Sequence, residues 1–211
     1  MSKLLKGIGN SKEVKNFYDN WSSAYDKTLN EWNYKAPKQA ALTLKKYSIN
    51  RPRFLLDLAC GTGLFALEIK KIFPAIICDG SDISKKIINI SLQKNLYRNL
   101  YLSSFEKNIR SESDYDIVSL IGGMTYCANY QLLFKRVYNY LKNKGYFIFT
   151  QRIDIWKKLN FDKILKLNED KFEIFYKSRP LNYLPKNENF GTKVKIRIVL
   201  MSKKKSLDCL D

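Results

Sequence analysis

Two carboxylates and two glycines have the residue types and the spacing of a site for a nucleotide cofactor. Asp57 lies in an apolar stretch that runs into the turn Gly61-Thr62-Gly63, and Asp82 follows Gly63 by nineteen residues. Glycine lets the chain turn sharply and lets a ligand approach the backbone. An acid about twenty residues beyond such a turn has the spacing of a carboxylate that accepts both hydroxyls of a ribose. We therefore expect these residues to bind a cofactor that carries a ribose.

Asp57 distinguishes this turn from the turn that binds dinucleotides. In dinucleotide-binding proteins the first strand is usually apolar throughout, and the acid comes only at the end of the second strand. Here an acid lies in both places, and an acid buried at a strand end needs a cationic or hydrogen-donating partner. An NAD-dependent oxidoreductase is therefore a disfavoured alternative. The alternative without a function is a glycine turn whose neighbouring acids bind no ligand.

These residues need strands and helices to hold them, and the apolar pattern predicts both. Apolar runs of strand length alternate with segments of helical periodicity, as a parallel sheet with crossover helices requires. The predicted strands are 55–58, 75–78, 100–102, 116–120, 146–149, 172–176 and 194–200. The predicted helices are 11–30, 37–47, 64–73, 85–95, 132–141 and 156–167. In such a sheet ligands bind beyond the carboxyl ends of the strands.

The motifs resemble those of a known enzyme family. The run Asp57-Leu58-Ala59-Cys60-Gly61-Thr62-Gly63 is similar to the first motif of class I S-adenosylmethionine-dependent methyltransferases, and Asp82-Ile83-Ser84 is similar to their second. Upstream, the aromatic segment 17–26 resembles the first helix of small methyltransferase-domain proteins. The resemblance covers about residues 14–155 and is to the branch of the Williams-Beuren syndrome region methyltransferase and the tetratricopeptide-repeat methyltransferases.

The resemblance implies an α/β fold, with a Rossmann-like, doubly wound sheet of seven mostly parallel strands and an antiparallel last strand. A chain of 211 residues has the ordinary size for one hydrophobic core, so we expect a single domain over residues 1–211. Within it we expect an N-terminal helical lid (1–50), a cofactor-binding core (53–150), and a part with the substrate-side helix and the last strands (151–211).

The resemblance also implies roles for individual residues. Asp57 and the two glycines would hold the methionine end of S-adenosylmethionine, Asp82 the ribose, and Tyr25 would lie near the methionine end. Where many relatives have an aspartate that accepts from the adenine amino group, this sequence has Ser104, with Phe105 placed to stack beside the ring. The expected cofactor-binding residues are Trp21, Tyr25, Asp57, Ala59, Gly61, Gly63, Asp82, Ile83, Ser104, Phe105, Ile121 and Gly122.

Residues beyond the fourth and fifth strands are candidates for an acceptor pocket. The loop 121–127 should face the methyl group, and the segment 179–185 is a long connection that would help to close the pocket. The candidate residues are Met124, Tyr126, Tyr130, Arg152 and Trp156. Packing in the core or on the surface explains each of them equally well. No residue is assigned a catalytic role from the sequence.

The chain contains no histidine, the residue that most often serves as a general base and as a metal ligand. The four cysteines have no paired spacing, so we expect a reducing compartment and no metal site. Methylation of an amine or a thiol needs little more than positioning of the nucleophile in line with the methyl group. We therefore expect a reaction that needs neither a metal ion nor a histidine base.

The net charge of +18 raises nucleic acid as a partner without favouring it. Lysine far outnumbers arginine and is spread along the chain, which is typical of a solvated basic surface rather than of bidentate phosphate recognition. No stretch of about 18 consecutive apolar residues exists, so we expect no membrane association and a cytoplasmic protein. The oligomeric state is not indicated.

The main prediction is an S-adenosylmethionine-dependent methyltransferase that acts on a small-molecule acceptor and leaves S-adenosylhomocysteine (SAH). A small acceptor is preferred because no appended recognition domain is evident. The first alternative is an RNA or protein methyltransferase that docks through its basic surface. The second is a regulatory protein that binds the cofactor without transferring its methyl group.

Overall fold

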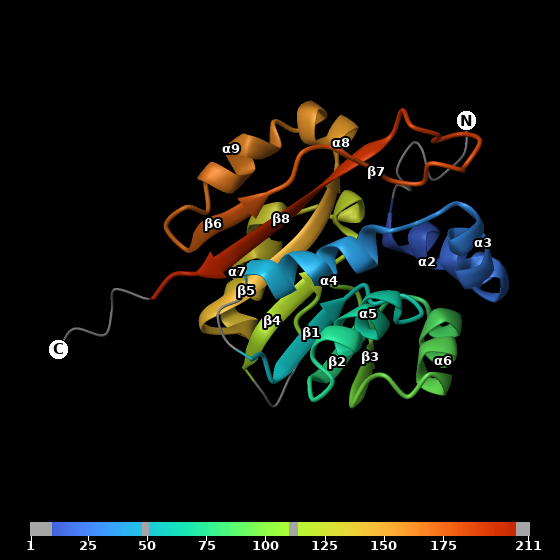
Figure 1. Ribbon diagram of the computed structural model, residues 1–211, viewed down its shortest axis with the longest axis horizontal. Coiled ribbons are helices and arrows are strands. Elements are labelled where there is room, and N and C mark those ends of the chain that lie inside the picture. The colour runs from blue at the N-terminus through green and yellow to red at the C-terminus, as the bar shows by residue number, and fades with distance from the viewer. Residues whose placement is uncertain (1–9, 48–50, 110–113, 206–211) are drawn as a thin grey trace.

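The computed structural model describes residues 10–47, 51–109 and 114–205. Its centre is an eight-stranded sheet in the order β3-β2-β1-β4-β5-β8-β6, with β7 paired to β8 (Figure 1). Strands β1 to β5 run parallel, and β8 runs antiparallel to its neighbours β5, β6 and β7. The strands are β1 (Phe54–Leu58), β2 (Ile77–Asp82), β3 (Asn99–Leu102), β4 (Tyr115–Leu120), β5 (Leu141–Arg152), β6 (Phe172–Lys177), β7 (Leu181–Asn182) and β8 (Lys195–Lys203).

Helices cover both faces of this sheet because successive strand residues point to opposite sides. Leu55 on β1 joins an apolar cluster with α4 and α5, whereas Leu56 joins a cluster with α7, α8 and α9. The helices of the described residues are α2 (Ser11–Trp21), α3 (Tyr25–Glu31), α4 (Ala36–Tyr47), α5 (Leu64–Ile72), α6 (Lys85–Gln93), α7 (Tyr130–Tyr140), α8 (Ile153–Lys158) and α9 (Phe161–Lys166), with short 3-10 turns η1 (Ser22–Ala24) and η2 (Met124–Tyr126).

The α/β fold with a mostly parallel sheet and antiparallel pairing near its end is confirmed. The count of seven strands was one short, because the two-residue strand β7 lies inside the segment 179–185 that was expected to be a loop. The helix expected at 156–167 is two helices, α8 and α9, separated at Asn160, whose positive φ of 45° is not helical. The helix expected at 11–30 is interrupted by η1.

The N-terminal helices α2 and α3 lie together at one end of the sheet (Figure 1). Leu29 on α3 forms a third apolar cluster with Leu184 and Phe190, which follow β7. This cluster joins the beginning of the chain to its last third. Together the two segments cover the edge at which β1, β2 and β4 end.

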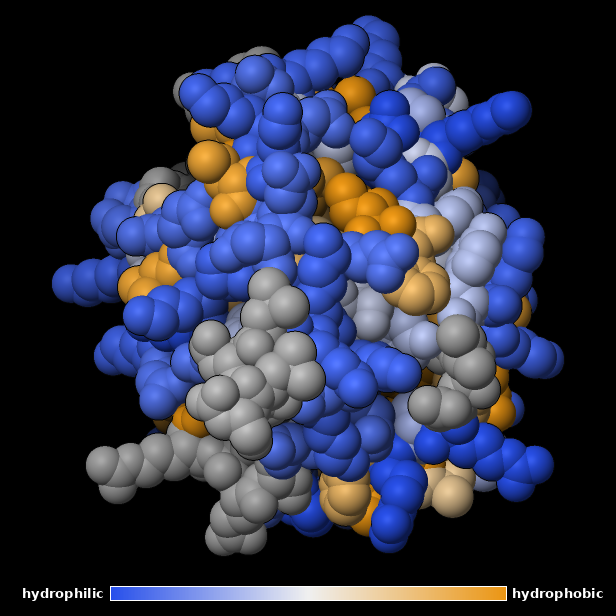
Figure 2. All heavy atoms as spheres, turned by 90° about the vertical axis from the view of Figure 1, so that its left-hand side faces the viewer, coloured by the Kyte–Doolittle hydropathy of each residue, from blue (hydrophilic) through white to orange (hydrophobic). Residues whose placement is uncertain are grey.

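The outer surface at the β6 end of the sheet is largely hydrophilic, with scattered apolar patches (Figure 2). Within the described residues, no helix has the length and apolar character needed to cross a membrane.

Candidate functional site

A cavity with an empty volume of about 1080 Å³, including its mouth, lies at the carboxyl ends of the parallel strands. Small-molecule sites typically occupy ~300–1,000 Å³ and are found at this edge of doubly wound sheets. Its walls come from α2, α3, the loops after β1 to β4, the end of β5, and the residues Tyr183, Leu184 and Phe190, which we call the 183–190 segment. The cavity therefore combines segments from the whole length of the chain.

The glycine turn after β1 forms the floor of this cavity. Gly61 has φ of 57° and Gly63 has φ of 90°, in the left-handed region that glycine adopts without strain. Gly61 lines the cavity, and a Cβ placed there would lie 3.6 Å from the Tyr25 hydroxyl oxygen. Gly63 is outside the lining, because it packs against Leu96, whose Cδ1 would lie 3.0 Å from an added Cβ.

Asp82, at the end of β2, presents a carboxylate to the cavity. Its Oδ2 accepts from the backbone N–H of Gly61 (3.0 Å), and its Oδ1 accepts from that of Ser84 (2.9 Å). Burial raises the pKa of Asp82 to about 6, although these backbone donors act in the opposite direction. An ionised carboxylate has about four acceptor positions, so Asp82 keeps acceptor capacity for ligand hydroxyls.

Asp57 lies deeper and lines a smaller cavity of about 320 Å³ that shares Tyr25, Tyr34 and Gly61 with the main one. Only 1% of its surface is exposed. Its carboxylate accepts from the hydroxyls of Tyr97 (2.8 Å) and Ser119 (2.7 Å). Burial outweighs these bonds and raises the pKa of Asp57 to about 7.

The partners of Asp57 were not foreseen from the sequence. Ser119 carried a signal, since it is a polar residue in the otherwise apolar end of β4. Tyr97 carried none, because it lies in the connection between α6 and β3 and reaches Asp57 only through the tertiary fold.

Most other residues expected at the cofactor site do line the main cavity. Ile83, Ser104 and Phe105 lie together on one wall, at the ends of β2 and β3. Trp21 and Tyr25 lie on the wall formed by the N-terminal helices, with their ring centroids 4.8 Å apart. Ala59, Ile121 and Gly122 complete the part of the lining that comes from β1 and β4.

The five acceptor-pocket candidates divide into two groups. Tyr126 and Arg152 line the cavity; the Tyr126 hydroxyl lies 3.0 Å from that of Tyr18, and the Arg152 guanidinium is paired with Asp154. The structure does not bring the other three into the lining. Met124 is fully buried, the Tyr130 hydroxyl donates to the Met124 carbonyl (3.3 Å), and the Trp156 Nε1 donates to Asp162 (2.8 Å).

Three tyrosines that line the cavity, Tyr18, Tyr34 and Tyr183, were missed as individual site residues. The hydroxyl oxygens of Tyr34 and Tyr183 lie 2.9 Å and 3.8 Å from the position that a Cβ would take on Gly122, which has φ of 86°. No site role was expected for Tyr34, and Tyr183 was expected only as part of the segment 179–185 that would help to close the pocket. Burial raises the pKa of both phenols, so they stay neutral at physiological pH.

The cavity thus offers a carboxylate for hydroxyl donors, a deeper acid next to it, an aromatic wall and a group of neutral phenols. These groups fit a cofactor with a ribose, a flat ring and a positive charge. Within the described residues there is no cluster of three or more His, Cys, Asp or Glu side chains that could hold a metal ion.

Comparisons with known proteins agree with this geometry. A family model described as a methyltransferase domain matches residues 29–167. A protein of Geobacillus sp. (strain WCH70) named as a methyltransferase is 25% identical over 78% of this chain and 70% of its own length. Methyltransferase-like protein 27 of Homo sapiens is 30% identical over 58% of this chain, which spans about half (51%) of that relative.

A solved structure shares the fold over nearly the whole chain. The plantazolicin methyltransferase BpumL, in complex with a pentazolic desmethylPZN analog and SAH, superposes with a TM-score of 0.60 at 14% identity and covers 96% of this chain and 94% of its own. The family match includes the glycine turn, Asp82 and the loop after β4. The chain therefore belongs to the methyltransferase-domain family and is an S-adenosylmethionine-dependent methyltransferase.

Proposed function

We propose that the protein methylates a small-molecule acceptor that binds in the same cavity as the cofactor. One observation carries the proposal: Asp82 and the tyrosine hydroxyls beside Gly122 face a single space, and that space is roofed by α2, α3 and the 183–190 segment. A small acceptor fits under such a roof more readily than a folded macromolecule does. In this account α2 and α3 contribute the lid, the described residues of 53–150 the cofactor-binding core, and those of 151–205 the substrate side.

The cofactor would be held from three directions. Asp82 would accept the ribose hydroxyls, and Asp57 would attract the amino group of the methionine end. Ile83 and Phe105 would cover the faces of the adenine ring, with Ser104 nearby as a hydrogen-bonding group. When bound, S-adenosylmethionine supplies an electrophilic methyl group on a sulfonium.

The residues around Gly122 would position the acceptor instead of deprotonating it. Burial holds the pKa of Tyr34 and Tyr183 well above the usual value of a tyrosine, so neither phenol is an effective base near neutral pH. An acceptor that arrives with a free lone pair, such as a neutral amine, a thiolate or a carboxylate, needs only alignment and exclusion of water.

Transfer into fractionated cell extract tests this proposal. The protein is incubated with S-adenosylmethionine labelled on its methyl group and with separate small-molecule, RNA and protein fractions. We expect the label in the small-molecule fraction. Label in RNA or protein alone would overturn the proposal.

A second candidate function, methylation of RNA or protein through the basic surface, is supported by the net charge of +18. Phosphate contacts by lysines make nucleic-acid binding fall steeply with salt. This candidate therefore predicts that transfer into RNA is lost as salt is raised, whereas transfer to a small acceptor in the cavity is expected to change little.

A further inference from the structure

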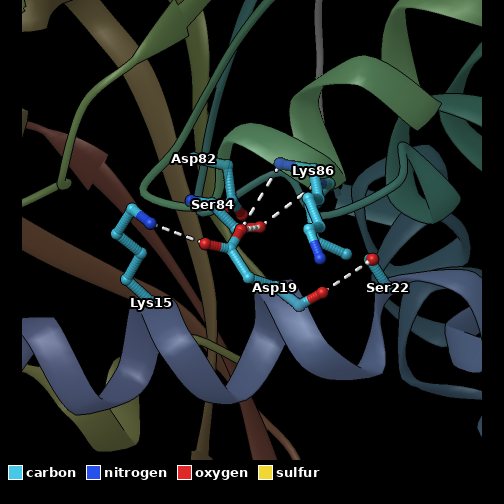
Figure 3. Close-up of polar contacts among 7 residues, drawn as sticks. Lys15, Asp19, Ser22, Asp82, Ser84 and Lys86 are labelled. Atoms are coloured by element: carbon cyan, nitrogen blue, oxygen red, sulfur yellow. Dashed lines mark hydrogen bonds and ion pairs between the residues drawn. The ribbon is translucent and has the colours of Figure 1, made fainter.

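Two carboxylates of the N-terminal helices bind directly to the loops that carry the cofactor site. Asp19 on α2 accepts from the Ser84 hydroxyl (2.5 Å), from the Lys15 ammonium (2.6 Å) and, more weakly, from the Lys86 backbone N–H (3.4 Å) (Figure 3). Asp26 on α3 accepts from the Thr62 hydroxyl (2.5 Å) and from the Lys94 ammonium (2.6 Å). We call the Asp19–Ser84 and Asp26–Thr62 hydrogen bonds the two clasps.

Each clasp ends on a residue next to a cofactor-binding group. The backbone N–H of Ser84 donates to Asp82, and its hydroxyl accepts from the Ile87 N–H at the start of α6. Figure 3 shows Ser84 between Asp19 and Asp82. Thr62 is the residue between Gly61 and Gly63 in the glycine turn. A displacement of either loop would therefore break its hydrogen bond to the N-terminal helices.

The clasps add polar contacts to the partial apolar packing of α2, in which Tyr18 and Trp21 make ring contacts with Tyr25. None of its residues is fully buried. Between α3 and α6 a solvent-open hollow is lined by Ser22, Asp26 and Lys86, where apolar contacts would otherwise fasten the helices. The acid at Asp19 also lies at the N-terminus of α6, where the helix dipole favours a negative charge. The Lys15–Asp19 pair within α2 is exposed on one side and contributes little by comparison.

We propose that Asp19 and Asp26 are positioning residues that fasten α2 and α3 as a lid over the bound cofactor. The two clasps set the loops of Asp82 and Gly61 and place Trp21 and Tyr25 against the cavity. Opening of both clasps is the step that admits the cofactor and releases the SAH product. The inference rests on cofactor binding and does not depend on the identity of the acceptor.

The test measures how fast SAH leaves the protein. In the Asp19→Ala and Asp26→Ala variants we expect the SAH dissociation rate to rise roughly tenfold each, as loss of a hydrogen bond to a charged group implies, and further in the double variant. The dissociation constant of SAH at equilibrium should rise in the same variants. Asp19→Asn, which keeps an acceptor oxygen for Ser84, should restore part of the retention.

Glu31→Ala is the matched control, because Glu31 is an exposed acid at the end of α3. Its SAH dissociation rate should equal that of the wild type. Hydrogen exchange of the wild-type protein is a second measurement that needs no variant: SAH should slow exchange of backbone amides in 11–31. An unchanged dissociation rate in a folded double variant, or equal exchange of 11–31 with and without SAH, would overturn the proposal.

Discussion

At the scale of the residue, Asp57 and Asp82 are two buried acids at neighbouring strand ends that are held by different groups. Asp82 accepts from two backbone N–H groups, whereas Asp57 accepts from two side-chain hydroxyls. Burial raises the pKa of both, to about 6 for Asp82 and about 7 for Asp57. Asp57 is therefore partly protonated near neutral pH, in a cavity where a positive charge would favour its ionised form.

This difference predicts that SAH binding is linked to a proton on Asp57. The positive amino group of SAH should lower the pKa of Asp57 from about 7, because an opposite charge stabilises the carboxylate. Below that pKa, binding must release a proton, so affinity falls as the pH falls through about 7 towards 6. Above a pH of about 7, Asp57 is already ionised in the free protein, so binding releases no proton from it.

Titration calorimetry in two buffers of different ionisation enthalpy measures the released protons. Asp57→Asn is the diagnostic variant, since it cannot ionise; Asp82, whose pKa is about 6, remains in it as an internal reference. Proton release that is the same in the variant and the wild type would show that Asp57 does not face the amino group.

At the scale of the element, the sequence predicted best those segments whose periodicity and local signals agree. Helix α6 was expected at 85–95 and spans 85–93, because Ser84 caps it and Ile87 and Ile88 face the core. The break at η1 was missed because apolar residues continue on one face from Trp21 to Tyr25. Strand β7 was missed because it has only two residues, follows directly after Pro180 and pairs only with β8.

Replacement of Asp79 on β2 tests whether the stability of the sheet can be lowered without a change in the affinity for SAH. Asp79 is 1% exposed, and it binds the Arg98 guanidinium, the Tyr115 hydroxyl (2.8 Å) and the Asn99 backbone N–H (3.1 Å), which joins β2, β3 and β4. Asp79→Ala leaves these donors without their acceptor, so we expect a loss of about 3 kcal/mol in the free energy of unfolding. Urea denaturation measures it.

The same variant should keep wild-type affinity for SAH in the fraction that is folded, because Asp79 does not line the cavity. The exposed Asp170 provides a control for removal of a carboxylate, and Asp170→Ala should leave stability within about 0.5 kcal/mol of the wild type. A large loss of SAH affinity in folded Asp79→Ala would mean that the hydrogen bonds of Asp79 also set the geometry of Asp82.

At the scale of the whole molecule, the sequence could predict the proposed cofactor end of the cavity but little of its proposed acceptor end. The proposed cofactor end contains the continuous motif 57–63 and Asp82, which follows it in the sequence. Spacing alone therefore predicts Gly61 and Asp82 as site residues. The acceptor end combines Tyr34, Tyr126 and Tyr183, which are far apart in the chain. No local pattern places three such tyrosines side by side, and Met124 and Trp156 were equally good candidates until packing placed them in the core.

The net charge of +18 is a property of the whole chain, and the positive residues are not concentrated in the cavity. Among the described residues, the lining holds one cation, Arg152, which is paired with Asp154, and two acids, Asp82 and Glu106. The cavity is therefore suited to a cofactor with hydroxyl and amino donors, and no lysine of the described residues lines it.

Titration calorimetry of SAH against wild-type protein and the Asp82→Asn variant tests the central claim, that this cavity is the S-adenosylmethionine site and that Asp82 holds the ribose. The account predicts binding of one SAH per chain to the wild type and affinity roughly 10- to 100-fold weaker in Asp82→Asn, because a neutral amide accepts more weakly than a carboxylate. Equal affinity in the two proteins, or binding of NAD without binding of SAH, would contradict it.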